Sequence, residues 1–366
     1  MASLMLLAFL APCVLAAILT FLMRGASRRI GFVDRPGGHK QHAAPVALGG
    51  GMAIFISACA PLVIATAAAR VWHFSAPHWL PDILRPHVAG IATRLPEVLA
   101  IVGGALVLHV MGLLDDVHPL PSGPRLIVQA VVAFFLVWGF ELRALRFLDS
   151  YMPIPVSIPL TVLWIVVITN AFNFLDNMDG LCAGVAALAG AIFALTAMSA
   201  NQIFVPAMAW ILVGALVGFL LFNFAPASIF MGDAGSMVIG YLLAVLTVLT
   251  TFYDPRQQTR PFGVLVPLVV LAVPLYDAIT VVFHRLRARQ SIFRGDRRHF
   301  SHRLVQRGLS TRAAVLTIYL ATGATSLGAV LLPHAEWPGA CVIFGQCLCV
   351  VAIIAILEHA KAKSQP

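Results

Sequence analysis

The chain has 366 residues, of which 60% are hydrophobic and only 11% are charged, with a formal net charge of +9. A soluble domain of this length would carry roughly a quarter of its residues charged, so most of this surface faces something other than water. The six cysteines lie in or beside apolar runs without metal-ligand spacing, which argues against disulfides and zinc. We expect one membrane domain over residues 1–366 with no nucleic-acid partner.

Apolar runs of about 20 residues, the length of a membrane-spanning helix, recur along the chain and predict an all-α polytopic integral membrane protein. The first run has no positive residue before Arg24, which favours a retained helix over a cleaved signal peptide. The eleven predicted transmembrane helices cover about residues 4–23, 50–69, 98–114, 126–140, 158–173, 181–199, 205–223, 236–252, 263–284, 313–332 and 339–357.

The distribution of positive charge predicts the orientation. With the N-terminus on the periplasmic side, 17 of the 24 lysines and arginines fall in cytoplasmic segments, as the positive-inside rule requires. The C-terminus is then cytoplasmic. Residues 70–97 form an external loop of unassigned function, in which Trp72 and Trp79 suit the membrane interface.

Several aspartates lie at or near the ends of predicted spans, where burying a charged side chain in the membrane is energetically unfavourable. A charged side chain near the centre of a spanning helix costs roughly 2.5–3.5 kcal/mol, so such residues are functional candidates. Asp115 and Asp116 end one span, and adjacent carboxylates repel unless a divalent cation or a basic side chain holds them. A water-exposed helix end is the alternative. Eight aspartates fall on the predicted cytoplasmic side or edge: Asp34, Asp115, Asp116, Asp176, Asp179, Asp233, Asp277 and Asp296.

The next polar cluster begins in the last residues of the fifth predicted span. At 3.6 residues per turn, Asn170, Asn173 and Asn177 share one narrow arc, flanked by Asp176 and Asp179. Five amide and carboxylate groups on one face suit a cation, a sugar or a nucleotide. A water-filled transport path is the alternative.

Two further aspartates are candidates. Asp233 stands between Gly232 and Gly235, where the backbone can approach a ligand closely, and Ser236 adds an oxygen of the kind that hard cations prefer. Asp277 lies about 10 Å inside its span, counting 1.5 Å per residue. Asp277 is either a functional residue or a buried acid whose hydrogen bonds are all made within the protein.

The segment 291–303 combines basic residues and histidines. His299 and His302 are spaced to share one face of a short helix, and Arg297, Arg298 and Arg303 offer donors that suit phosphate. Zinc would need more ligands than the nearby Asp296 provides.

Taken together, and in their order along the chain, these polar motifs resemble those of the polyprenyl-phosphate N-acetylhexosamine-1-phosphate transferase family (glycosyltransferase family 4). Ser301 departs from the family pattern, which often has a further histidine there, and Arg125 stands where a lysine is common. The likeness runs from about residue 31 to 312 through residues 33–36, Lys40, His42, Gly49, Gly50, Asp115, Asp116, 173–180, 223–236, Asp277 and 296–303.

The resemblance implies transfer of an N-acetylhexosamine-1-phosphate, with GlcNAc-1-phosphate favoured, from a UDP-sugar to undecaprenyl phosphate. UMP is released, and a cell-surface polysaccharide such as an O-antigen of lipopolysaccharide is begun. The alternatives are the phospho-MurNAc-pentapeptide transferase of peptidoglycan synthesis and, in another class, a transporter or flippase of polyprenyl-linked sugars. The resemblance also implies a homodimer in the bacterial inner membrane with its active site on the cytoplasmic face.

The resemblance further implies a magnesium cofactor, with Mn²⁺ as an alternative, held by Asp233 and Asp179. The implied catalytic residues are Asp115, Asp116, Asp176 and Asp179, and the separate roles of Asp115 and Asp116 stay open. The implied substrate-binding residues are Lys40, His42, Asn173, Asn177, Asp277, Arg297, His299, His302 and Arg303.

Overall fold

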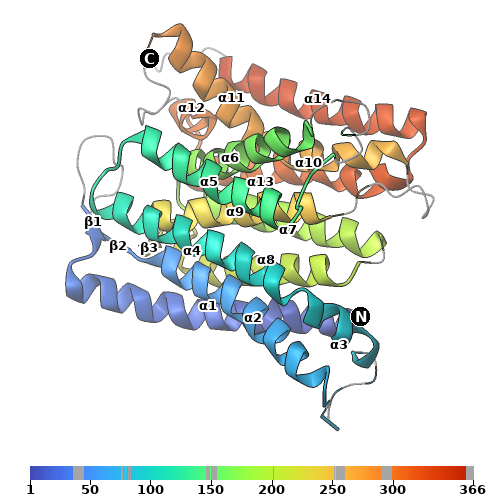
Figure 1. The fold of residues 1–366 in the computed structure, drawn as a ribbon. Helices are drawn as coiled ribbons and strands as arrows, with labels where there is room; N and C mark the ends of the chain where they lie inside the picture. The colour runs from blue at the N-terminus through green and yellow to red at the C-terminus, as the bar shows by residue number, and fades with distance from the viewer. Residues whose placement is uncertain are drawn as a thin grey trace, which may run out of the picture.

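The computed structural model is a bundle of helices that run between two ends of the molecule (Figure 1). It describes residues 1–35, 45–75, 77, 78, 80, 82, 84–145, 149, 155–200, 202–250, 252, 260–289 and 299–359. Within these residues, ten helices are long and apolar enough to cross a membrane, and one bent pair of helices brings the number to eleven. The prediction of a helical, multi-pass membrane protein is thereby confirmed.

The helices follow the chain in simple order. The first seven are α1 (Ala2–Ile30), α2 (Gly50–Trp72), α3 (Arg85–Thr93), α4 (Leu95–Val117), α5 (Ser122–Gly139), α6 (Ser157–Leu175) and α7 (Leu181–Ser199). The rest are α8 (Phe204–Asn223), α9 (Gly232–Leu249), α10 (Val266–Val270), α11 (Ala272–Arg287), α12 (Phe300–Gln306), α13 (Thr311–Leu327) and α14 (Trp337–His359). Short 3₁₀ helices cover Pro261–Leu265 and Gly328–His334.

The span predicted over residues 263–284 is broken. The segment Pro261–Val270 and α11 meet at 61° around Leu271. Pro274 lies in the first turn of α11, where its missing N–H removes no helical hydrogen bond. The proline is therefore compatible with a helix that restarts at Ala272, whereas it would disrupt a continuous one.

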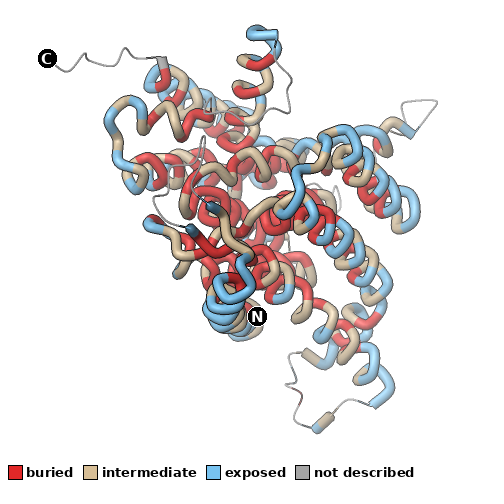
Figure 2. The backbone as a smooth tube through the Cα atoms, turned by 90° about the vertical axis from the view of Figure 1, so that its left-hand side faces the viewer, coloured by how far each residue is buried: buried red, intermediate tan, exposed pale blue. Residues whose placement is uncertain are grey.

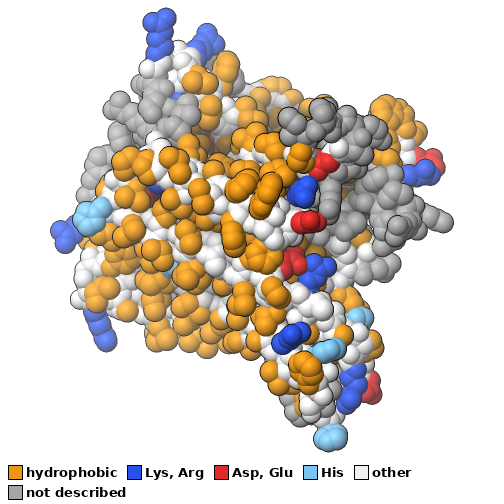
Figure 3. Space-filling model, viewed as in Figure 1, with side chains coloured by type: hydrophobic (Ala, Val, Ile, Leu, Met, Phe, Trp, Pro, Cys, Tyr) orange, Lys and Arg blue, Asp and Glu red, His pale blue; other side chains and the backbone are white. Residues whose placement is uncertain are grey.

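Apolar surface covers the outside of the bundle. In the most hydrophobic stretch of α7 and of α9, 78% of residues are buried inside the protein, against 22% in α1 and α14. Buried segments accordingly gather in the middle of the end-on view (Figure 2), and hydrophobic side chains dominate the side of the bundle shown in Figure 3. Apolar side chains on this scale are unfavourable in water and favourable against lipid.

A three-stranded sheet, which the sequence did not predict, lies at one end of the bundle (Figure 1). Its strands are β1 (Val33–Asp34), β2 (Val46–Leu48) and β3 (Ile229–Phe230). Ala47 of β2 pairs antiparallel with Val33 and parallel with Ile229. The sheet therefore joins the segment after α1 to the loop that leads into α9.

The helices α4 and α9 approach each other closely at this end. A Cβ atom added to Gly112 of α4 would overlap backbone atoms of Asp233 and Ala234 in α9. Glycine at this position lets the last turn of α4 lie directly against the first turn of α9.

We expect Gly112→Ala to lower the stability of the protein, because the added methyl group has no room. Overpacking of this kind typically costs about 1–3 kcal/mol. Thermal unfolding of the detergent-solubilised protein measures the effect. Gly103→Ala is the matched control, since it lies on the same helix with nothing within 4 Å of the added Cβ. Equal melting temperatures for the two variants would contradict the packing described here.

Candidate active site

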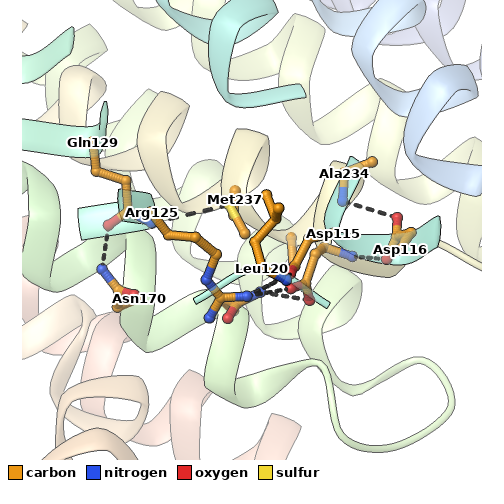
Figure 4. Close-up of polar contacts among 11 residues, drawn as sticks. Asp115, Asp116, Leu120, Arg125, Gln129, Asn170, Ala234 and Met237 are labelled. Atoms are coloured by element: carbon orange, nitrogen blue, oxygen red, sulfur yellow. Dashed lines mark hydrogen bonds and ion pairs between the residues drawn. The ribbon is translucent and has the colours of Figure 1, made fainter. Parts of the chain in front are cut away.

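Polar side chains from four helices meet at the end of the bundle that carries the sheet. Asp115 and Asp116 lie in the last turn of α4, and Arg125 lies near the start of α5. Asn173 lies in the last turn of α6, and Asp233 in the first turn of α9. The contacts between α4, α5 and α9 are drawn in Figure 4.

Asp116 caps the N-terminus of α9. One carboxylate oxygen, Oδ1, accepts a hydrogen bond from the backbone N–H of Asp233 at 2.8 Å, and Oδ2 accepts one from Ala234 at 3.2 Å (Figure 4). The first N–H groups of a helix have no partner within the helix, and a carboxylate there also complements the helix dipole. Gly232 has a φ of 67° and lies so close to the Asp116 carboxylate that a Cβ would clash with it.

Arg125 joins two carboxylates. Its Nη1 atom forms an ion pair with Oδ2 of Asp115 and lies 2.9 Å from Oδ2 of Asp233. Asp115 also accepts a hydrogen bond from the backbone N–H of Leu120 at 2.5 Å. The neighbouring aspartates Asp115 and Asp116 therefore have different partners: a basic side chain for the first and a helix N-terminus for the second.

Asn173 completes the surroundings of Asp233. Its amide group donates to Oδ1 of Asp233 at 2.9 Å and to the hydroxyl of Ser236 at 3.0 Å. The Asp233 side chain nevertheless keeps 32% of its surface exposed, compared with 7% for Asp115. Asp233 is thus a fixed carboxylate that a ligand can still reach.

The predicted arc of three asparagines is wrong, because α6 ends at Leu175. Asn177 lies beyond the helix, where its amide donates to the carbonyl of Phe174 at 2.7 Å and satisfies an acceptor at the helix end. Asn170 is on the helix but donates to Oε1 of Gln129 in α5 at 2.5 Å. Of the three, only Asn173 contacts Asp233 in these hydrogen bonds.

Asp176 and Asp179 lie in the turn between α6 and α7. Asp179 accepts a hydrogen bond from the backbone N–H of Ala227 at 2.8 Å, and Gly180 donates to Oδ1 of Asn223 at 3.0 Å. This turn is therefore tied to the loop after α8. Burial raises the pKa of the Asp176 carboxyl to about 8, with further contributions from the charges of Asp116 and Asp179. The crowding of negative charge favours a bound cation.

The donor set of this cluster suits magnesium. Among the described residues, no three His, Cys, Asp or Glu side chains form a ready-made metal site. Magnesium does not require one, since it commonly takes one or two carboxylates and completes its shell with water and substrate phosphate. The partly exposed carboxylate of Asp233 and the crowded carboxyls of Asp176 and Asp179 are hard oxygen donors of that kind.

A second polar group involves α11 and α12. Asp277 is fully buried, and its Oδ2 lies 2.8 Å from Nδ1 of His299 while its Oδ1 accepts from the N–H of Phe300 at 3.0 Å. Both oxygens are therefore used within the protein. This arrangement orients the imidazole of His299, whose ring centre lies 6.4 Å from that of His302.

The remaining predicted site residues divide into two sets. Arg303 forms an ion pair with Glu358 of α14 at 3.0 Å. Lys40, His42 and Arg297 lie outside the residues that the structure describes.

Sequence reasoning omitted Arg125 from the site residues, although a basic residue shortly after two adjacent aspartates was a usable signal. It also missed Glu358, whose signal was an acid at the end of the last apolar span.

A multi-pass membrane protein with a carboxylate- and amide-rich site at one end of its helices is the class that this fold and site define. A sequence model of glycosyl transferase family 4 matches residues 98–251. A Bacillus subtilis (strain 168) protein named "probable undecaprenyl-phosphate N-acetylglucosaminyl 1-phosphate transferase" is 31% identical over an alignment of 342 residues that covers 92% of this chain and 87% of that protein. The chain belongs to glycosyl transferase family 4.

Two other relatives agree with this assignment. The decaprenyl-phosphate N-acetylglucosaminephosphotransferase of Mycobacterium tuberculosis (strain ATCC 25618 / H37Rv) is 33% identical over 347 residues, covering 86% of this chain and 80% of that protein. The undecaprenyl-phosphate alpha-N-acetylglucosaminyl 1-phosphate transferase of Escherichia coli (strain K12) is 26% identical over 326 residues, with coverage of 87% and 81%.

We expect Asp116→Ala to destabilise the protein by about 0.5–2 kcal/mol, because two N–H groups at the start of α9 lose their acceptor. Asp116→Asn should cost less, since its side-chain carbonyl can still accept one hydrogen bond. Thermal unfolding in detergent measures both variants. Asp82→Ala is the control, because Asp82 is a fully exposed partner of Arg85. A melting temperature for Asp116→Ala no lower than that of the control would rule out the capping role.

Proposed function

We propose that the protein transfers N-acetylglucosamine-1-phosphate from UDP-N-acetylglucosamine to undecaprenyl phosphate in a magnesium-dependent reaction. The observation that carries the proposal is Asp233, which is held by Arg125 and Asn173 yet remains open to a ligand. The names of the relatives support the acceptor and the sugar phosphate.

The proposed reaction joins two anions. An oxygen of the lipid phosphate attacks the sugar-bearing phosphorus of the donor, and the bond between that phosphorus and the bridging oxygen breaks. UMP leaves with the bridging oxygen, and the product is undecaprenyl-diphospho-N-acetylglucosamine. The second pKa of a phosphate monoester is about 6, so the nucleophile is mostly dianionic at pH 7 and a strong general base is unnecessary.

The residues of the site have distinct roles in this proposal. Asp233, together with Asp179 or Asp176, would hold a magnesium ion, and Asn173 fixes the carboxylate of Asp233. A bound magnesium ion supplies neutralisation of the charge on the diphosphate. Arg125, held by Asp115, presents a positive charge at the start of α5 for the lipid phosphate. His299, oriented by Asp277, binds the donor together with His302.

We place the site on the cytoplasmic face of the bacterial inner membrane. Arg28 and Arg29 lie in the last turn of α1, and Arg285 and Arg287 lie in the last turn of α11. These helix ends lead into the segments that carry the sheet and His299, so positive charge accumulates near the site, as the positive-inside rule expects of a cytoplasmic face. A lipid-anchored phosphate and a water-soluble donor can meet there without either one crossing the bilayer.

The first test incubates detergent-purified protein with undecaprenyl phosphate, magnesium and radiolabelled UDP-N-acetylglucosamine. We expect label in the lipid fraction and release of UMP, both abolished by EDTA and by Asp233→Ala. Asp82→Ala should keep full activity, because its side chain is fully exposed in the segment before α3 and pairs only with Arg85 in the described contacts. Transfer from another UDP-hexosamine or from UDP-MurNAc-pentapeptide alone would change the pathway. Absence of transfer from every UDP-sugar by the folded protein would refute the proposal.

We expect Asp277→Asn to lower kcat/KM for the donor by about 10- to 100-fold, because a small displacement of a group that positions the substrate can have an effect of this size. The amide keeps the size of the side chain but not the charge that holds Nδ1–H of His299. Thr280→Val is the matched control, since the Thr280 hydroxyl donates only to the backbone carbonyl of Asp277 in the described contacts. Equal kinetics for both variants would argue against an orienting role.

A further inference from the structure

The last helix carries a buried acid at its end. Glu358 is the only acidic residue in α14 (Trp337–His359), and its side chain is 1% exposed. A carboxylate buried in this way is costly unless it is paired and hydrogen-bonded. The partners of Glu358 therefore indicate what the residue does.

Among the described residues, side chains from α11, from α12 and from the residue that follows α12 reach Glu358. Nη2 of Arg303 in α12 lies 3.0 Å from its Oε2, and the hydroxyl of Tyr276 in α11 donates to the same oxygen at 3.1 Å. Arg307, just after α12, donates to the backbone carbonyl of Glu358. The end of α14 is thereby joined to both helices that carry the second polar group of the site.

The helix α12 depends on such contacts for its position. It has only seven residues, Phe300–Gln306, and helices this short are unstable without tertiary packing. Asp277 holds its N-terminal end through His299 and Phe300. Glu358 holds the following turn through Arg303, which is adjacent to His302.

We propose that Glu358 is a positioning residue, which acts through Arg303 to hold α12 and so keeps His299 and His302 in place for the sugar-nucleotide donor. This inference rests on the proposed function, in which the two histidines bind that donor. It also gives Arg303 a different role from the one that the sequence implied: the guanidinium pairs with a protein carboxylate instead of a substrate phosphate.

The test compares Glu358→Gln with Glu336→Gln in the full-length protein. Glu336 precedes the other end of α14 and forms an exposed ion pair with Arg260 at 3.4 Å, with 78% of its side chain exposed. Exposed pairs contribute little, whereas loss of one partner of a buried pair leaves an uncompensated charge. The control therefore removes the same charge next to the opposite end of α14 without affecting α12.

We expect Glu358→Gln to raise the KM for UDP-N-acetylglucosamine about tenfold or more, because small displacements of binding groups have effects of this size. The KM for undecaprenyl phosphate should stay within about twofold of the wild-type KM. Glu358→Asp, which keeps the charge, should recover part of the loss. Glu336→Gln should change neither constant. Equal rises in both KM values, or a loss of kcat alone, would overturn the positioning role.

Hydrogen exchange provides a readout that does not depend on activity. In peptides that cover residues 299–307, amide hydrogens should exchange faster in Glu358→Gln than in the wild-type protein. In peptides that cover residues 109–117, the exchange rate should be unchanged. If the original protein transfers no sugar phosphate, the proposed function fails, but this measurement still tests the contact. Unchanged exchange over residues 299–307 would overturn the inference whatever the activity.

Discussion

Two backbone N–H groups at the start of α9 donate to the carboxylate of Asp116, at 2.8 Å from Asp233 and 3.2 Å from Ala234. Ala234 is buried, and buried N–H groups at a helix N-terminus without such an acceptor would be costly. The contact requires α4 and α9 to approach closely, which Gly112 and the left-handed Gly232 permit. Because it fixes the first turn of α9, it also fixes the position of the Asp233 carboxylate.

The other contacts of the site are made to the Asp233 carboxylate, whose position the first turn of α9 fixes. Arg125 reaches Asp233 from α5, and Asn173 reaches it from α6. Burial, and after it the charges of Asp116 and Asp179, raise the pKa of the Asp176 carboxyl. A site that must bring two anionic substrates together needs additional positive charge. This requirement is the physical reason to include magnesium in the proposed reaction.

Sequence reasoning located the helices because lipid imposes a strong hydrophobic signal on each span, and it selected Asp115, Asp116 and Asp233 because carboxylates are rare in such helices. It missed the sheet, whose strands of two or three residues are too short to show a pattern. It placed Asn177 on α6 because helical periodicity does not reveal where a helix ends. The separate roles of Asp115 and Asp116 depend on partners that are distant in sequence.

The site has two parts, and Ser301 links them. Its hydroxyl donates to Oδ1 of Asn177 at 2.6 Å, which connects α12 to the turn between α6 and α7. Ser301 is fully buried, so an imidazole at this position would need space that the short hydroxyl does not. The serine that departs from the family pattern is therefore accommodated by a specific contact. That contact couples the histidines, which Asp277 and Glu358 hold from one side, to the carboxylates on the other.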